Sequence, residues 1–97
     1  MTRRITAAFD VDGTLIDEND EPRQDIISVL RALMPYCDIV VWSGSGISYA
    51  KMQGRRIFLP RGIIYWDKAG HADISFDDQD ITLGTVNINV TRREDDD

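Results

Sequence analysis

The chain has 97 residues, enough for one domain with a single hydrophobic core and too few for two. Its formal net charge is −6, but residues 94–97 are all acidic, so much of that charge lies at the end of the chain. Without this tail the acidic side chains only slightly outnumber the 11 basic ones, which argues against a broad nucleic-acid-binding face. We expect a core domain over residues 1–91 and an acidic, disordered tail over residues 92–97.

The cysteine content and the N-terminal sequence bear on the cellular compartment. Cys37 is the only cysteine, so an intrachain disulfide is impossible and nothing indicates an oxidising compartment. The first apolar run is too short for a signal peptide or a membrane span, and Asp10 interrupts it. These features predict a soluble, cytoplasmic protein.

The first half of the chain predicts a strand, a helix and a second strand. Residues 5–9 are a short apolar run, as in a buried strand. Pro22 is expected to open a helix, whose apolar residues repeat with a period of 3.6 and which ends near Pro35. Residues 38–42 carry a second apolar run, typical of a buried strand, and the glycine-rich residues 43–46 form the turn after it.

The middle of the chain is less clearly patterned. A helix is expected over residues 47–53, with Gly54 as its stop. Residues 57–59 are interpreted as a third strand. Residues 62–66 are apolar but ambiguous.

The last third of the chain predicts two more strands. Residues 72–76 are an apolar run that ends at a pair of acids, and residues 85–90 alternate with period 2, like a half-buried edge strand. Strands separated by helices are typical of an α/β fold, so we predict a Rossmann-like three-layer sandwich with a mostly parallel central sheet.

Polar side chains follow three of the predicted strands directly. Asp10, Ser43 and Asp77 each come immediately after an apolar run. Ligands of open α/β sheets bind at the carboxyl ends of the strands. The sequence therefore predicts that these three residues meet at one edge of the sheet.

Paired carboxylates at this edge indicate a metal site. Asp10 and Asp12 are two residues apart, and residues i and i+2 of an extended chain point to the same side. Two carboxylates so placed repel each other unless a cation or a proton intervenes. Asp77 and Asp78 add carboxylates from another strand. Oxygen ligands of this kind suit Mg²⁺.

Four segments of the chain resemble, in order, the four motifs of the haloacid dehalogenase-like (HAD) superfamily. Residues 9–15, Phe-Asp-Val-Asp-Gly-Thr-Leu, resemble the first motif, D-x-D-G-T after an apolar strand. Residues 40–44 resemble the second motif, an apolar strand that ends in Ser or Thr. Lys68 is placed like the lysine of the third motif, and residues 74–78 resemble the fourth, an apolar strand that ends in paired acids. The motifs cover residues 5–78, most of the chain.

This resemblance implies a phosphatase that works through a phosphorylated aspartate. Asp10 would attack phosphorus, and Asp12 would protonate the leaving oxygen and then activate water. Lys68 would neutralise phosphoryl charge, and Ser43 would bond a phosphate oxygen.

The resemblance also implies the metal ligands and the backbone around the substrate. The metal contacts carried over are the Asp10 carboxylate, the Asp12 backbone carbonyl and an acid from Asp77 and Asp78, of which Asp77 is favoured because it comes first after the strand. The remaining candidate substrate-binding residues are Gly13, Thr14 and Gly44.

The choice of lysine rests on the chain itself. Lys51 follows Ser43 by eight residues, most of them on a predicted helix, which places it roughly 8–12 Å from the strand ends. Lys68 lies in the loop that leads into the strand before Asp77, so it is preferred.

The chain is too short for the cap that most HAD members insert over a small substrate, and only residues 17–21 could form a small flap. By resemblance, members without a cap act on phosphorylated macromolecules, such as polynucleotides or proteins, or borrow a second copy as a cap. Small molecules, polynucleotides and proteins therefore all stay open as substrates.

Each motif also has a plainer interpretation. Residues 10–13 alone fit a turn, because Asp and Gly favour turns. Residues 43–46 could cradle a nucleotide phosphate, although they match neither the dinucleotide fingerprint nor the P-loop. Residues 77–80 could be a solvated acidic loop. Three arginines are either exposed or bind a second phosphate of a polynucleotide: Arg55, Arg56 and Arg61.

Two other functions compete with the phosphatase. A regulatory module could keep the fold and the metal or phosphate site without turnover, because a site without a cap is wet and wet sites weaken electrostatic catalysis. A receiver-like phospho-acceptor domain uses the same residue types, but its acid pair precedes the acceptor, whereas here D-x-D comes first.

Overall fold

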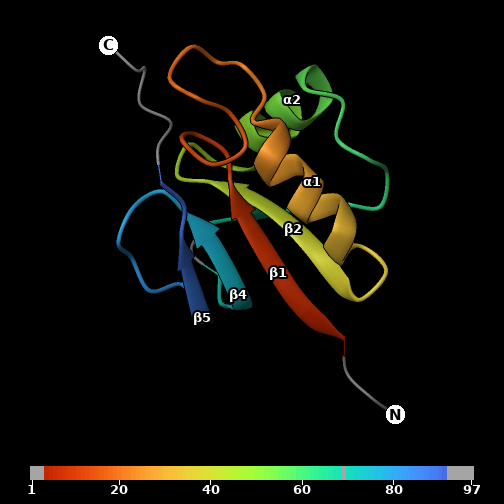
Figure 1. The fold of residues 1–97 in the computed structure, drawn as a ribbon, viewed down its shortest axis with the longest axis vertical. Helices are drawn as coiled ribbons and strands as arrows, with labels where there is room; N and C mark the ends of the chain where they lie inside the picture. Colours follow the sequence, from red (N-terminus) through yellow and green to blue (C-terminus); the bar gives the residue numbers. More distant parts are fainter. Residues whose placement is uncertain (1–3, 69, 92–97) are drawn as a thin grey trace.

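The protein forms an α/β domain, seen in a computed structural model that describes residues 4–68 and 70–91 (Figure 1). In chain order its elements are β1 (Ile5–Asp10), α1 (Gln24–Leu33), β2 (Cys37–Ser43), α2 (Ile47–Arg56), β3 (Ile64–Asp67), β4 (Ala72–Asp77) and β5 (Gly84–Asn89). Neither of the described helices has the length and apolar character needed to cross a membrane. The predicted acidic tail, residues 92–97, lies outside the described residues.

The described strands form one parallel sheet in the order β3-β2-β1-β4-β5. Phe9 of β1 pairs with Val41 of β2 on one side and with Phe76 of β4 on the other. All three strands therefore run in register to the same edge of the sheet. The predicted α/β class and parallel sheet are confirmed.

The main core lies between the sheet and both helices. Alternate residues of the central strands point into it, because successive side chains of a strand face opposite ways. The rings of Phe9 and Phe76 stack within this core, with their centroids 4.3 Å apart. Its other fully or almost fully buried members include Ala7, Ile39 and Val41 of the sheet, Ile27 and Leu30 of α1, and Ala50 of α2.

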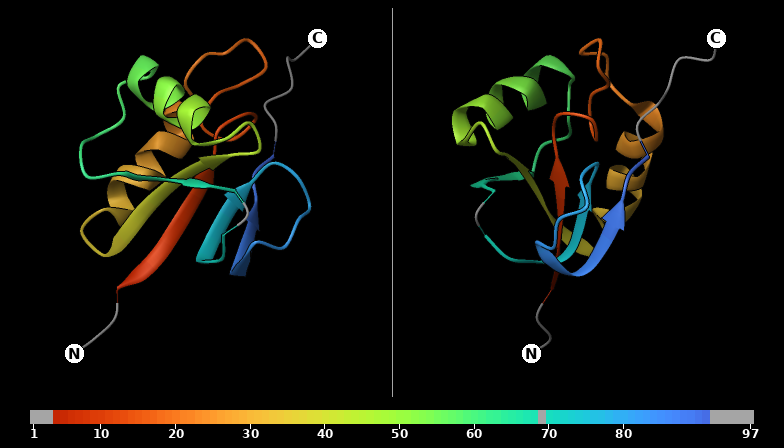
Figure 2. Two further views of the ribbon diagram at one scale, coloured as in Figure 1. Left: turned by 180° about the vertical axis from the view of Figure 1, so that it is seen from behind. Right: turned by 90° about the vertical axis from the view of Figure 1, so that its left-hand side faces the viewer.

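Loops, and not helices, cover the other face of the sheet. Its buried cluster consists of Ala8, Val40, Trp42 and Ala72, with Leu83 packed against it, and includes no residue of either described helix. The described residues between β3 and β4, and those between β4 and β5, form no helix (Figure 2). The Rossmann-like strand order is thus present, but the layer on this face is built from short connections.

The predicted strand at residues 57–59 is wrong. The helix α2 continues to Arg56, and Phe58 after it has φ 58° and is 84% exposed. The predicted stop, Gly54, lies inside the helix, where a Cβ would collide with the hydroxyl group of Tyr65. Gly54 therefore permits close packing of α2 on β3, and the chain turns only afterwards.

The two other uncertain segments form strands at the edges of the sheet. The ambiguous residues 62–66 contribute most of β3. The strand β5 is at the edge, as predicted for residues 85–90, but it is not half-buried: Val86 is 53% and Ile88 41% exposed. The period-2 pattern predicted the strand correctly, whereas its burial depends on a covering element that the described residues do not supply.

The burial of two adjacent residues on α1 predicts that one substitution strongly lowers the free energy of unfolding and that its neighbour hardly changes it. Leu30 is fully buried, so Leu30→Ala is expected to lower the free energy of unfolding by about 2–4 kcal/mol through lost burial and a residual cavity. Val29 is 39% exposed, and Val29→Ala is expected to change the free energy of unfolding by less than about 0.5 kcal/mol. Urea denaturation followed by far-ultraviolet circular dichroism measures both, and equal losses would contradict this placement of α1.

Candidate active site

Three carboxylates meet at the carboxyl ends of β1 and β4. Asp10 ends β1 and Asp77 ends β4, and they are neighbours because Phe9 and Phe76 pair in the sheet. Asp78 follows directly. One oxygen from each of these three carboxylates lies within 4.8 Å of the others. The predicted meeting of the ends of β1 and β4 is thus present.

Lys68 joins this cluster from the connection between β3 and β4. Its Nζ donates a hydrogen bond to Asp10 Oδ1 at 3.0 Å and forms an ion pair with Asp77 Oδ2 at 2.7 Å. The side chains of Lys68, Asp10 and Asp77 are only 17%, 7% and 3% exposed. Lys68 is thus paired with both buried carboxylates, and the oxygen donors of Asp10, Asp77 and Asp78 together fit a hard divalent cation such as Mg²⁺.

The pKa values reflect this crowding of charge. Burial raises the pKa of Asp10 from its ordinary value of 3.8 to about 7; Lys68 opposes this shift, and the charges of Asp77 and Asp78 add to it. Burial would lower the pKa of Lys68, but its contacts with Asp77 and Asp10 outweigh burial and raise it. Lys68 therefore stays an ammonium near neutral pH.

Ser43 and Gly44 line a pocket that opens beside Lys68. Ser43, the last residue of β2, is buried, and its Oγ accepts a hydrogen bond from the Ser45 backbone at 3.0 Å. Gly44 is exposed, and a Cβ there would meet no atom within 4 Å. Both residues and Lys68 line the same pocket, so Lys68 connects the turn after β2 to the carboxylate cluster.

The carboxylate of Asp12 is not in the cluster, contrary to the prediction that it points to the same side as Asp10. The extended chain ends at Asp10, and the carbonyl of Val11 accepts the hydrogen bonds of a tight turn from Thr14 and Leu15. The exposed Asp12 instead accepts a 2.7 Å hydrogen bond from the Tyr49 hydroxyl, which raises the pKa of Tyr49. The i, i+2 rule fails because it assumes a straight strand.

The turn after β1 brings Gly13 against Asp78. Gly13 has φ 82°, and a Cβ there would collide with the Asp78 carboxylate. Thr14 is fully buried, so it supports the turn from inside and does not face solvent. The buried Arg23 donates hydrogen bonds to the carbonyls of Gly13, at 3.3 Å, and Thr91, at 2.9 Å. Glycine is thus required at position 13 both for its backbone angle and for the room it leaves.

Sequence reasoning missed two residues that support the site, Tyr49 and Arg23. Tyr49 lies on α2, and Arg23 is the N-cap of α1. Their partners are 37 and 10 residues away in sequence, at Asp12 and Gly13. No local pattern in the sequence marks such contacts, because they arise only when the elements pack.

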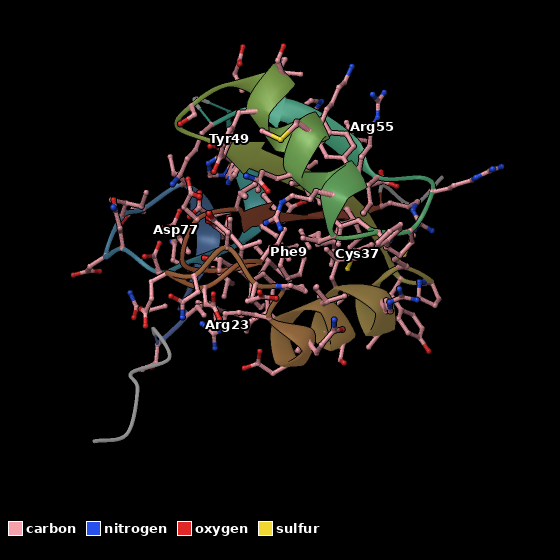
Figure 3. The ribbon with its side chains drawn as sticks, turned by 90° about the horizontal axis from the view of Figure 1, so that it is seen from above. Phe9, Arg23, Cys37, Tyr49, Arg55 and Asp77 are labelled. Atoms are coloured by element: carbon pink, nitrogen blue, oxygen red, sulfur yellow. The ribbon has the colours of Figure 1, made fainter. Side chains whose placement is uncertain are left out.

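The other lysine and the arginines of α2 lie elsewhere. Lys51, Arg55 and Arg56 line a separate surface hollow along α2, which also includes Ser48 and Met52. Figure 3 shows Arg55 on the side of α2 that is remote from Asp77. Lys68, and not Lys51, is therefore the lysine at the carboxylate cluster.

Comparison with protein-family models, with curated proteins and with solved structures found no match. The relationship to the HAD superfamily accordingly stays a resemblance of motifs, and the chemistry has to be argued from the site.

Replacement of Gly13 tests the contact with Asp78. Gly13→Ala adds a strained positive φ and a collision with Asp78, so we expect a loss of about 2–4 kcal/mol in the free energy of unfolding and weaker Mg²⁺ binding. Gly62 is the matched control: it has φ 91°, but a Cβ there would come no closer than 3.9 Å to Met34. Gly62→Ala should cost about 1–2 kcal/mol and leave Mg²⁺ affinity unchanged. Equal effects in urea titration and calorimetry would refute the role assigned to Gly13.

Replacement of Asp10 tests the buried charge. Because the pKa of Asp10 is raised to about 7, the proton binds more tightly to the folded protein, and this stabilisation is lost as pH rises from about 4 through 7. In metal-free buffer, Asp10→Asn should therefore be more stable than the wild type at pH 8, by about 1–4 kcal/mol, and show no gain at pH 4. Asp80→Asn, at an exposed position, should show no such dependence in thermal melts. A constant difference across this pH range would count against the buried charge.

Proposed function

We propose that this protein is a Mg²⁺-dependent phosphatase of the HAD type, which hydrolyses a phosphomonoester through an aspartyl-phosphate on Asp10. One observation carries the proposal: Lys68 bridges Asp10 and Asp77 at the ends of adjacent parallel strands, with Asp78 beside them. A nucleophilic carboxylate held by a cation next to a set of metal-ligand oxygens is what phosphoryl transfer to an aspartate requires.

The cation would be held by the carboxylates of Asp10, Asp77 and Asp78, together with the backbone carbonyl of Asp12 that the motif implies. When bound, Mg²⁺ supplies positive charge for the phosphoryl oxygens and favours the ionised form of Asp10. The burial of Asp10 and Asp77 supports this arrangement, because their charges have little access to water.

In the first step a carboxylate oxygen of Asp10 attacks phosphorus, and the bond from phosphorus to the leaving oxygen breaks. Asp12 donates a proton to that oxygen, so the product leaves as an alcohol. Lys68 neutralises charge on the phosphoryl group, and Ser43, on the wall of the same pocket, bonds one of its oxygens. The hydrogen bond from Tyr49 holds Asp12 on the solvent side, where the leaving alcohol departs.

In the second step water attacks the phosphorus of the aspartyl-phosphate. The ionised Asp12 takes the proton from that water, and the bond between phosphorus and Asp10 breaks. Inorganic phosphate leaves, Asp10 is again a carboxylate and Asp12 is again protonated, which completes the cycle.

Phosphate release tests this proposal. With Mg²⁺ and an aryl phosphate, the wild type is expected to release inorganic phosphate, and Asp10→Asn should reduce kcat by at least about 10³-fold because no covalent intermediate forms. Lys68→Ala should reduce kcat by about 10²-fold or more through lost charge stabilisation. Chelation of the metal with EDTA should abolish turnover, and added Mg²⁺ should restore it.

Two controls accompany this experiment. Lys51→Ala removes the chain's other lysine, which lies in the separate hollow on α2, and should leave kcat within about twofold of the wild type. Trapping with beryllium fluoride tests Asp10 directly, since it requires a competent carboxylate and bound Mg²⁺. Mg²⁺ binding without phosphate release and without trapping would support the alternative, a regulatory module that binds a cation.

A further inference from the structure

A pocket of about 440 Å³ opens directly beside the carboxylate cluster. Its walls are the turn after β2, the end of β3 and the connection between β4 and β5. The described residues that line it are Ser43, Gly44, Gly46, Asp67, Lys68, Ile81 and Leu83. Because Lys68 lines the pocket and also contacts Asp10 and Asp77, the pocket continues from the place where phosphate would react. Its volume is that of sites for small organic molecules.

The charges on the walls of this pocket disfavour a second anion. Lys68 is the single basic side chain among its described lining residues, and Lys68 is already paired with Asp10 and Asp77. The other charged lining residue is Asp67, an exposed acid that pairs in the sheet with Ser43. A second phosphate or a carboxylate here would meet Asp67 and find no free cation.

The remaining side chains define a surface with one polar and one apolar wall. Ile81 and Leu83 give apolar surface from the β4–β5 connection, and both are partly exposed. Asp67 offers carboxylate oxygens that accept hydrogen bonds from hydroxyl groups. A ligand with hydroxyl groups on one side and C–H groups on the other would satisfy both walls.

The cationic hollow on α2 does not extend this pocket. It is lined by Ser48, Lys51, Met52, Arg55 and Arg56, and it shares no residue with the pocket. Arg56 is also engaged, since it donates 2.6 Å hydrogen bonds to Gln53 and to the Asp20 carbonyl. A polynucleotide would need a continuous cationic path from Lys68, and the walls of the pocket offer Asp67 instead.

We propose that this pocket binds the leaving alcohol of the substrate, and that this alcohol is a neutral, polyhydroxylated molecule about the size of a monosaccharide. The substrate would thus be a monophosphate with no second anionic group. Asp67 accepts a hydrogen bond from a hydroxyl group of the alcohol and repels anionic competitors, while Ile81 and Leu83 contact its C–H face. This inference rests on the proposed phosphatase activity and adds the substrate class.

Matched phosphate donors test the substrate class. The wild type is assayed with acetyl phosphate, a hexose 6-phosphate, a hexose 1,6-bisphosphate and a 3′-phosphorylated oligonucleotide. The kcat/KM for the hexose monophosphate is expected to exceed that for the bisphosphate and the oligonucleotide by about tenfold or more. Asp67→Lys should reduce that preference over the bisphosphate by about tenfold, because repulsion becomes attraction.

Two further variants test whether the substrate preference depends on the pocket itself or on the charge of the protein in general. Asp80→Lys makes the same charge change on the β4–β5 connection at a residue that does not line the pocket, and should leave the preference within about twofold. Gly44→Leu adds a side chain into open space at the pocket wall. It should lower kcat/KM for the hexose monophosphate by about tenfold more than for acetyl phosphate, which is too small to need the pocket.

The outcomes distinguish this inference from the proposed function. Hydrolysis of acetyl phosphate combined with a preference for the bisphosphate or the oligonucleotide would overturn the substrate class and leave the phosphatase intact. An unchanged preference in Asp67→Lys would overturn the role of Asp67. No phosphate release from any of the four donors would overturn the proposed function, and the substrate class with it.

Discussion

The structure depends on buried carboxylates that lie close together at one edge of a parallel sheet. Asp10, Asp77 and Asp78 bring three carboxylates within reach of a single ion, and Lys68 is paired with the two that are buried. Such an arrangement costs stability in the absence of a cation, as the raised pKa of Asp10 indicates. Binding of a divalent cation would remove that cost, so stability and the proposed activity draw on the same interaction.

The position of Lys68 follows from the end of β3. Parallel strands end at the same edge, so Lys68, the residue directly after β3, starts at the edge where Asp10 and Asp77 end. Parallel strands also begin at the same, opposite edge, so the chain has to cross the sheet before Ala72 begins β4, five residues after Asp67 ends β3. A crossover helix would cover the sheet better, but it would add chain between the lysine and β4. The short connection thus explains why a loop covers this face of the sheet, whereas the end of β3 sets the position of Lys68.

The sequence could predict features that depend on local patterns, but not those that depend on contacts between elements. Apolar runs that end in Asp10, Ser43 or Asp77 revealed the strands and the edge they share, because burial and strand ends are local properties. The direction of the Asp12 carboxylate could not be predicted, since it depends on where the chain turns and on Tyr49 from α2. The role of Gly54 could not be predicted for a related reason: it is set by Tyr65, a residue on a different element. Local patterns predict elements, whereas contacts between elements decide what an individual side chain does.

The main objection to catalysis in so small a domain is that a site without a cap is open to water. The burial of the individual side chains answers this objection. Exposure differs sharply between residues with different proposed roles. The groups that hold charge, Asp10 and Asp77, are almost fully buried, and Lys68 is largely so. Asp12 and Asp67, proposed to handle the leaving alcohol, are exposed. Electrostatic stabilisation needs low dielectric only where charge develops, so the sheet edge and its loops can supply that environment while the alcohol side stays open.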